Sequence, residues 1–138
     1  MGSDGGMIEF PYKQCISQNI GVIWKPYAMV RVITNERNYR CQMLIDSGAD
    51  ITLIPKKAGD YLGFEPDKEM IREIRGIGEG AVPYIIKTVQ IEIGEYQIEG
   101  RIGWVLIEEV PFLLGRLDIF DQFDIKFDHL TRKVSFEK

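Results

Sequence analysis

One carboxylate stands where this sequence could perform chemistry. An apolar run that ends at Leu44 and Ile45 leads directly into Asp46, which is followed by Ser47 and Gly48. Asp, Ser and Gly are ordinary turn residues, so the triplet can simply cap a turn. A carboxylate at the end of a core-forming strand can also serve as a general acid or base. The triplet alone leaves both interpretations open.

Most other hydrolytic chemistries lack their residues in this chain. A Ser or Cys nucleophile normally needs a base, most often His, and the only one, His129, lies in a predicted turn. The glycine-rich segment 76–80 is not followed by the Lys-Ser/Thr of a phosphate-binding loop. Neither a calcium loop nor a zinc motif is formed by the remaining candidates, which are Asp118, Asp121, Asp124, Asp128, Cys15 and Cys41. We therefore expect no metal and no cofactor, and both cysteines as free thiols.

The elements that would position Asp46 are mostly strands. Two β-rich runs between Tyr27 and Asp46 flank the turn-forming residues 35–38, which predicts a hairpin. Residues 51–55 predict a short strand that ends at a proline, because proline cannot donate to a ladder. A brief helical or irregular piece is expected over residues 56–64.

The second half of the chain is also β-rich. Residues 70–110 alternate between β-rich stretches and glycines, and this pattern predicts a meander of antiparallel strands. The spacing of apolar residues in 116–123 predicts one short helix near the C-terminal end. Residues 124–137 predict two strands around a polar turn. The expected fold class is therefore mostly β with one short C-terminal helix.

Composition limits the class of protein further. The chain has 138 residues, 45% hydrophobic and 28% charged, with a formal net charge of -4. Scattered basic residues exclude a nucleic-acid surface, and the apolar stretches are too short for a membrane helix. We expect a cytoplasmic protein with one domain over residues 26–138. Residues 1–25 are interpreted as a cloning remnant followed by an N-terminal extension, which could be a dimer strand, a docking arm or a pro-segment.

A second motif changes the interpretation of Asp46. Leu113-Leu114-Gly115-Arg116 follows much later in the chain, and the segment 76–80 lies between the two motifs. In this order, the motifs resemble those of the retropepsin-type aspartic proteases, single-domain relatives of pepsin, over about residues 27–136. The resemblance implies a closed or folded β-sheet barrel of the acid-protease type. It also implies a homodimer as the active unit, because the chain has one Asp-Ser-Gly and hence half of a catalytic pair.

The resemblance also implies roles for individual residues. Asp46 would be the catalytic acid, supported by Ser47 and Gly48, and Asp50 would form a structural ion pair with Arg116. The expected substrate-binding residues form the pocket walls and a flap that covers the peptide: Leu44, Ala49, Asp50, Ile51, Leu113, Gly76, Ile77 and Gly78.

The function implied is an aspartic endopeptidase that cuts extended peptides or unfolded proteins, best at acidic to mildly acidic pH. Two carboxylates held together share one proton, so one acts as base and the other as acid on a water molecule. The alternatives are a non-catalytic protease-like dimer that binds peptides or partner proteins, and a dimerisation module of a larger chain.

Overall fold

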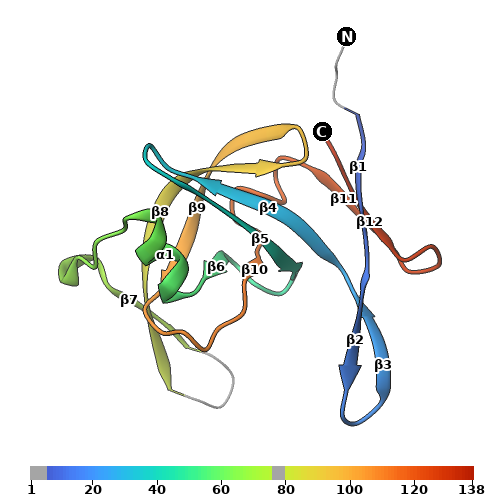
Figure 1. Cartoon of the computed structure of the whole chain (residues 1–138), viewed down its shortest axis with the longest axis horizontal. Coiled ribbons are helices and arrows are strands. Elements are labelled where there is room, and N and C mark those ends of the chain that lie inside the picture. The colour runs from blue at the N-terminus through green and yellow to red at the C-terminus, as the bar shows by residue number, and fades with distance from the viewer. Residues whose placement is uncertain (1–5, 76–79) are drawn as a thin grey trace.

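The computed structural model describes residues 6–75 and 80–138. Strands dominate these residues, with one α-helix and one short 3₁₀ helix among them (Figure 1). The elements are β1 Ile8–Pro11, β2 Lys13–Ser17, β3 Gly21–Lys25, β4 Tyr27–Ile33, β5 Asn38–Ile45, β6 Thr52–Ile54, α1 Lys56–Leu62, η1 Lys68–Met70, β7 Arg72–Arg75, β8 Ala81–Ile93, β9 Tyr96–Val105, β10 Leu113–Leu114, β11 Asp124–Asp128 and β12 Lys133–Glu137.

The largest sheet closes into a six-stranded barrel. Its strand order is β4-β5-β10-β6-β9-β8, and β8 pairs back onto β4. Closure is possible because β8 is 13 residues long. Its first four residues pair with β7, residues 84–93 pair with β9, and residues 90–93 also pair with β4. The predicted hairpin with a turn near residues 35–38 and the predicted meander are both confirmed.

Strict alternation places the core inside this barrel. In β4 every second residue is buried, namely Ala28, Val30 and Val32. Because side chains of a strand point alternately to opposite faces, this pattern lines one face of the sheet with apolar groups. The largest fully buried side chains are Trp104, Phe136, Met43, Ile54, Ile85, Ile91, Ile93, Ile102, Leu114 and Ile119.

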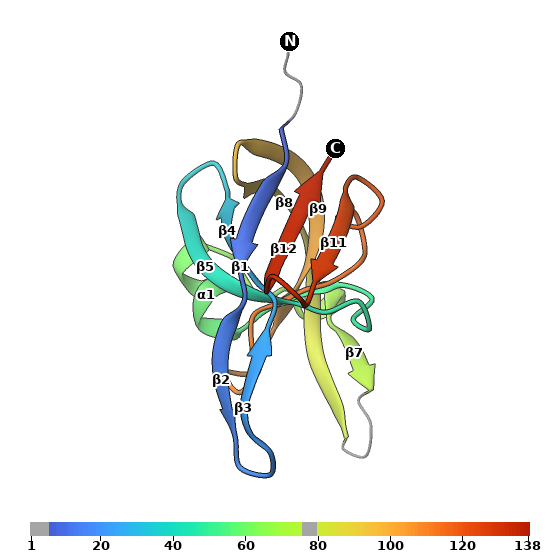
Figure 2. The ribbon, with the colours of Figure 1, turned by 90° about the vertical axis from the view of Figure 1, so that its right-hand side faces the viewer.

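Two smaller sheets involve the chain ends. Strand β1 pairs with β12, which in turn pairs with β11, and Phe10 of β1 packs edge-on against buried Phe136. Strands β2 and β3 form a separate hairpin that extends away from the barrel (Figure 2). The N-terminal extension therefore consists of one strand built into the fold and one projecting hairpin.

The helical piece expected over residues 56–64 is the helix α1. It begins after Pro55 and ends at Gly63, whose φ of 88° is the left-handed conformation that terminates many helices. Trp104 lies against this helix and donates its indole N–H to the carbonyl of Lys56 at 3.0 Å. A side chain at Gly59 would overlap that indole, so the helix can approach the barrel only at a glycine.

The C-terminal helix predicted over residues 116–123 is wrong. The segment forms consecutive turns, and the only α-helix in the described part of the chain is α1. Asp118 has a φ of 64°, which is incompatible with a right-handed helix. Its carboxylate accepts hydrogen bonds from the backbone N–H of Arg101 at 3.0 Å and from its guanidinium at 2.8 Å. This tertiary contact outweighs the helical spacing of the apolar residues.

Candidate active site

Asp46 lies at the end of β5, where the two sequence motifs meet. Strand β10 pairs in parallel with β5, so Leu113 faces Leu44 and Leu114 faces Ile45. The backbone N–H of Asp46 donates to the carbonyl of Leu114 at 3.0 Å. The second motif therefore fixes the backbone position of the acid, and the half-buried side chain of Asp46 leaves a rigid strand end.

The loop after β5 orients the carboxylate itself. The backbone N–H of Gly48 donates to Oδ1 of Asp46 at 2.9 Å, and the N–H of Ala49 donates to the Asp46 carbonyl at 3.1 Å. A Cβ added at Gly48 would lie 3.2 Å from Oδ1, tighter than most such contacts. Ser47 is exposed at the surface of the chain. The turn and the acid thus form one unit, so the two interpretations of the triplet are not exclusive.

A buried threonine connects the two motifs and was not anticipated from the sequence. Thr52 is 1% exposed, and its Oγ1 accepts the backbone N–H of Gly115 at 3.0 Å. A side chain at Gly115 would collide with the backbone of Ile51, so only glycine allows this approach. The N–H of Arg116 also donates to the carbonyl of Ala49 at 2.9 Å.

The predicted ion pair is not formed in this chain. Asp50 and Arg116 are both exposed, and the ion pairs found within residues 6–75 and 80–138 join other residues. The N–H of Leu117 nevertheless donates to the carbonyl of Asp50 at 2.9 Å. Both side chains line a surface depression of about 360 Å³ together with Leu117, Phe120 and Asp121. The last three residues were missing from the predicted site.

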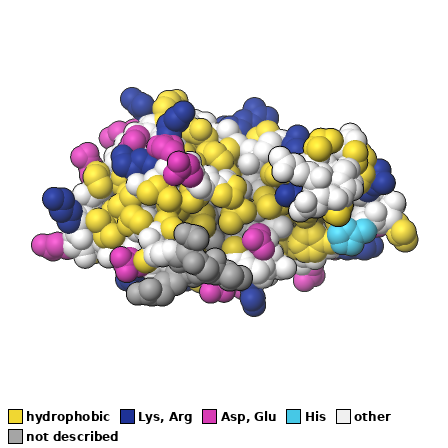
Figure 3. Space-filling view, turned by 90° about the horizontal axis from the view of Figure 1, so that it is seen from below, with side chains coloured by type: hydrophobic (Ala, Val, Ile, Leu, Met, Phe, Trp, Pro, Cys, Tyr) yellow, Lys and Arg dark blue, Asp and Glu magenta, His cyan; other side chains and the backbone are white. Residues whose placement is uncertain are grey.

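The remaining predicted substrate-binding residues fall into two groups. Leu44, Ala49, Ile51 and Leu113 are half-buried around the loop that follows Asp46, as walls of a binding surface would be. Gly76, Ile77 and Gly78 lie outside the described residues, and β7 and β8 pair up to Arg75 opposite Ala81. Figure 3 views the molecule from the side towards which β2, β3, β7 and β8 project, and hydrophobic side chains gather on this face.

Asp118 and Cys41 are among the groups whose pKa values are shifted from their ordinary values. The Arg101 guanidinium lowers the pKa of Asp118 by hydrogen bonding, and this effect outweighs the opposing effect of burial. Burial raises the pKa of the Cys41 thiol to about 12, so the group stays protonated near neutral pH. The structure therefore provides no activated thiolate at Cys41.

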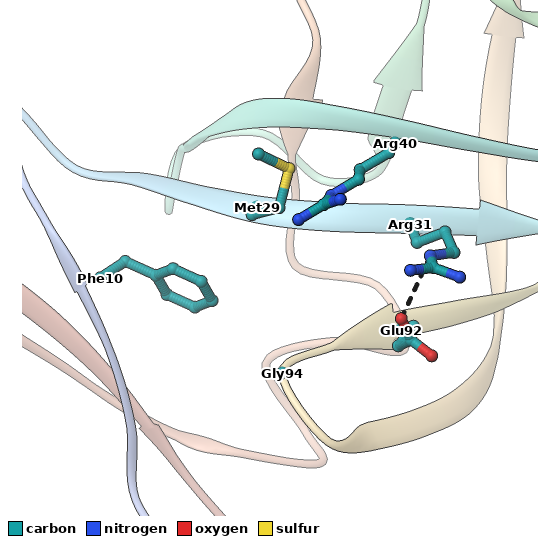
Figure 4. A pocket seen from close by; sticks show the side chains of 6 residues that line it. All are labelled: Phe10, Met29, Arg31, Arg40, Glu92 and Gly94. Atoms are coloured by element: carbon teal, nitrogen blue, oxygen red, sulfur yellow. Dashed lines mark ion pairs between the residues drawn. The ribbon is translucent and has the colours of Figure 1, made fainter.

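Another cavity of about 360 Å³ lies against the barrel wall, away from the acid. Its lining residues are Phe10, Met29, Arg31, Arg40, Glu92 and Gly94 (Figure 4). Arg31 lies opposite Arg40 and pairs with Glu92 at 3.2 Å, which offsets the repulsion between the two arginines. Arg40 is six residues before Asp46 on β5, roughly 20 Å along the strand, so this cavity is not part of the candidate site.

Neither a metal site nor a membrane span is found in residues 6–75 and 80–138. No three His, Cys, Asp or Glu side chains lie together as metal ligands there. No helix in those ranges is long and apolar enough to cross a membrane.

Comparisons with known proteins agree with this fold. Residues 29–116 match the family described as aspartyl protease. A retropepsin-like aspartic protease from Rickettsia conorii has a similar structure, with a TM-score of 0.64, 18% sequence identity, and coverage of 94% of this chain and 98% of that chain. The EIAV protease, solved in complex with the inhibitor HBY-793, gives a TM-score of 0.50, 24% identity, and coverage of 71% and 86%. No curated protein matches the sequence.

The chain belongs to the aspartyl protease family, and its fold is that of the retropepsin-like proteases. The family implies a peptidase of the aspartic type.

Proposed function

We propose that this protein is an aspartic endopeptidase whose catalytic pair is Asp46 and Asp46 of a second copy. The observation that supports it best is the fixed position of the acid: a strand pairing and a backbone hydrogen bond from β10 hold Asp46 at the end of β5. Such rigidity is what a catalytic group needs to reach productive geometry. A residue that only capped a turn would not require support from a distant motif.

The chemistry follows from two carboxylates about 3 Å apart, which cannot both be ionised. The ionised carboxylate removes a proton from a water molecule as the water oxygen attacks the scissile carbonyl carbon. The protonated carboxyl donates its proton towards the carbonyl oxygen, which would otherwise become an oxyanion. Transfer of a proton to the amide nitrogen then allows the C–N bond to break, so one water is consumed for each bond cut.

The proposed substrate is a peptide in an extended conformation. An extended chain offers free N–H and C=O groups, and the loop from Ala49 to Ile51, in which Asp50 is exposed, lies beside the acid and would receive them. The half-buried Leu44 and Leu113 would contact apolar side chains of the substrate. Gly76, Ile77 and Gly78 stay the predicted cover of the bound peptide.

The primary test is cleavage of an unfolded protein across a range of acidic to neutral pH. We expect the wild type to cut, a statine-type transition-state mimic to inhibit, and Asp46→Asn to be inactive although it preserves the acceptor for Gly48. Asp124→Asn is a matched control, because Asp124 is an exposed acid on β11. Cleavage that survives Asp46→Asn, or that ignores the mimic, would exclude the dyad.

Mixing the two proteins tests whether the pair is shared between chains. Equal amounts of wild type and Asp46→Asn, allowed to exchange subunits at constant total concentration, leave about one quarter of the dimers with two aspartates. Activity is therefore expected to fall to about one quarter of that of pure wild type, not to one half. A value of one half would mean that each chain works alone.

A further inference from the structure

The hairpin of β2 and β3, residues 13–25, is here named the arm. Its two strands pair with each other and, within the described residues, with no other strand (Figures 1 and 2). It extends in the same direction as the ends of β7 and β8. A lone two-stranded hairpin is only marginally stable in water. The arm therefore needs either support at its base or a surface to cover.

The base of the arm is supported by the turn between β11 and β12. The N–H of Tyr12 donates to the carbonyl of Arg132 at 2.9 Å, and the Tyr12 hydroxyl lies 3.2 Å from Nδ1 of His129. The Arg132 guanidinium lies over the Trp24 ring, 4.1 Å from its centroid. These contacts hold the arm in a defined direction, so little freedom remains to be lost when it binds.

One face of the arm carries large apolar side chains that are exposed. Ile16 is opposite Val22 in the strand register, and their exposed fractions are 77% and 50%. Trp24 follows on the same face at 37%, and Ile20 at the tip is 73% exposed. Large apolar groups concentrated on one exposed face mark an interaction surface.

The arm starts beside the catalytic acid. The carbonyl of Pro26, directly after β3, accepts the N–H of Ile45 at 2.9 Å, and Ile45 precedes Asp46. If two Asp46 side chains form a pair, the two-fold axis passes close to this point. Each five-residue strand of the arm spans about 17 Å, so the arm is long enough to contact the partner from a base near the axis.

Charge also favours a second copy as the partner. The arm carries Lys13 and Lys25, and no acidic residue occurs from residue 10 to residue 35. The whole chain has a net charge of -4, so removing the +2 of the arm leaves -6 for the rest. Lys13 and Lys25 lie opposite each other on the other face of the hairpin from Ile16 and Val22. Their charge therefore favours the approach of the arm to the acidic body of another copy and is not part of the apolar contact itself.

We propose that the arm holds the dimer together by packing Ile16, Val22 and Trp24 against a second copy of this chain. In a two-fold dimer the contact occurs twice, once for each arm. This inference rests on the proposed function, because the shared dyad places the axis at the base of the arm.

The first test compares dimer dissociation constants by sedimentation equilibrium. Ile16→Thr/Val22→Thr keeps β-branched residues opposite each other, so the hairpin is retained. We expect this variant to raise the dissociation constant about tenfold or more. Met70→Thr is the matched control, because Met70 is another exposed apolar residue, in η1, and we expect no change. An unchanged constant in the double variant overturns the proposal.

The second test uses Trp24 as a reporter. Trp104 is fully buried and gives a constant signal, whereas Trp24 is partly exposed in the single chain. The emission maximum should therefore shift to the blue as protein concentration rises through the dissociation constant, and Trp24→Phe should abolish the shift. An active dimer with unchanged Trp24 emission overturns the role of the arm and leaves the dyad intact. A chain that stays monomeric and inactive at all concentrations overturns the proposed function, and the role of the arm with it.

Discussion

Replacing Thr52 with Val tests whether one buried hydroxyl joins the two sequence motifs of the candidate site. Val has nearly the same shape but cannot accept a hydrogen bond, so the N–H of Gly115 would be left buried without a partner. A buried unsatisfied donor costs about 1–3 kcal/mol. In a chain of 138 residues, a loss of this size corresponds to a fall in Tm of about 4–12 °C.

The assay is thermal unfolding followed by circular dichroism, with cleavage of an unfolded protein as a second readout. Thr52→Ser is the control, because it keeps the hydroxyl and removes one methyl group. We expect Thr52→Val to lose both stability and kcat, since the hydroxyl ties the loop after Asp46 to β10, and Thr52→Ser to keep most of its activity. The reverse order, with Val harmless and Ser damaging, would show that methyl packing matters and the hydrogen bond does not.

Two further predictions concern ionisable groups. Because the Arg101 guanidinium lowers the pKa of Asp118 from its ordinary value of 3.8, the pair stabilises the fold above pH 3.8, and this stabilisation is lost as pH falls through the folded-state pKa. Asp118→Asn, which tolerates the left-handed backbone, should lower Tm at neutral pH and make the decline of Tm in acid less steep. Parallel curves of Tm against pH for the wild type and the variant would contradict this. With its pKa raised to about 12 by burial, Cys41 should resist alkylation by iodoacetamide at about pH 8, whereas half-exposed Cys15 should react. Mass spectrometry should find one alkylated thiol in the folded chain and two in urea. Rapid alkylation of Cys41 in the folded chain would contradict its burial.

The strand framework was predictable because its signals are local. The alternation in β4 and β5 and the turn residues between them specify a hairpin without reference to the rest of the fold. Leu113-Leu114-Gly115 was recognised in a different way, through its resemblance to a family motif in its order after Asp46-Ser47-Gly48. The motif positions therefore indicated the site before any contact was known.

The parts that escaped prediction depend on contacts between distant segments. Asp118 interrupts a helical pattern because Arg101, on β9, binds its carboxylate. Thr52 is an ordinary strand residue, and its hydroxyl has a structural role only because it accepts the backbone N–H of Gly115, which is distant in the sequence. No pattern within one segment carries such information, since both partners are common residue types in their own elements.

One chain positions the acid of the candidate site but supplies only one of the two carboxylates that the proposed mechanism needs. One chain fixes the backbone of Asp46 through β10 and its carboxylate through Gly48, so folding alone prepares the acid. In the proposed mechanism the proton-sharing partner comes from a second copy, and the base of the arm lies at the same place through the hydrogen bond between the N–H of Ile45 and the carbonyl of Pro26. Folding stability and catalytic activity should therefore separate: substitutions within the barrel lower both, whereas substitutions on the arm lower activity only where the dimer is diluted, and a high protein concentration restores it.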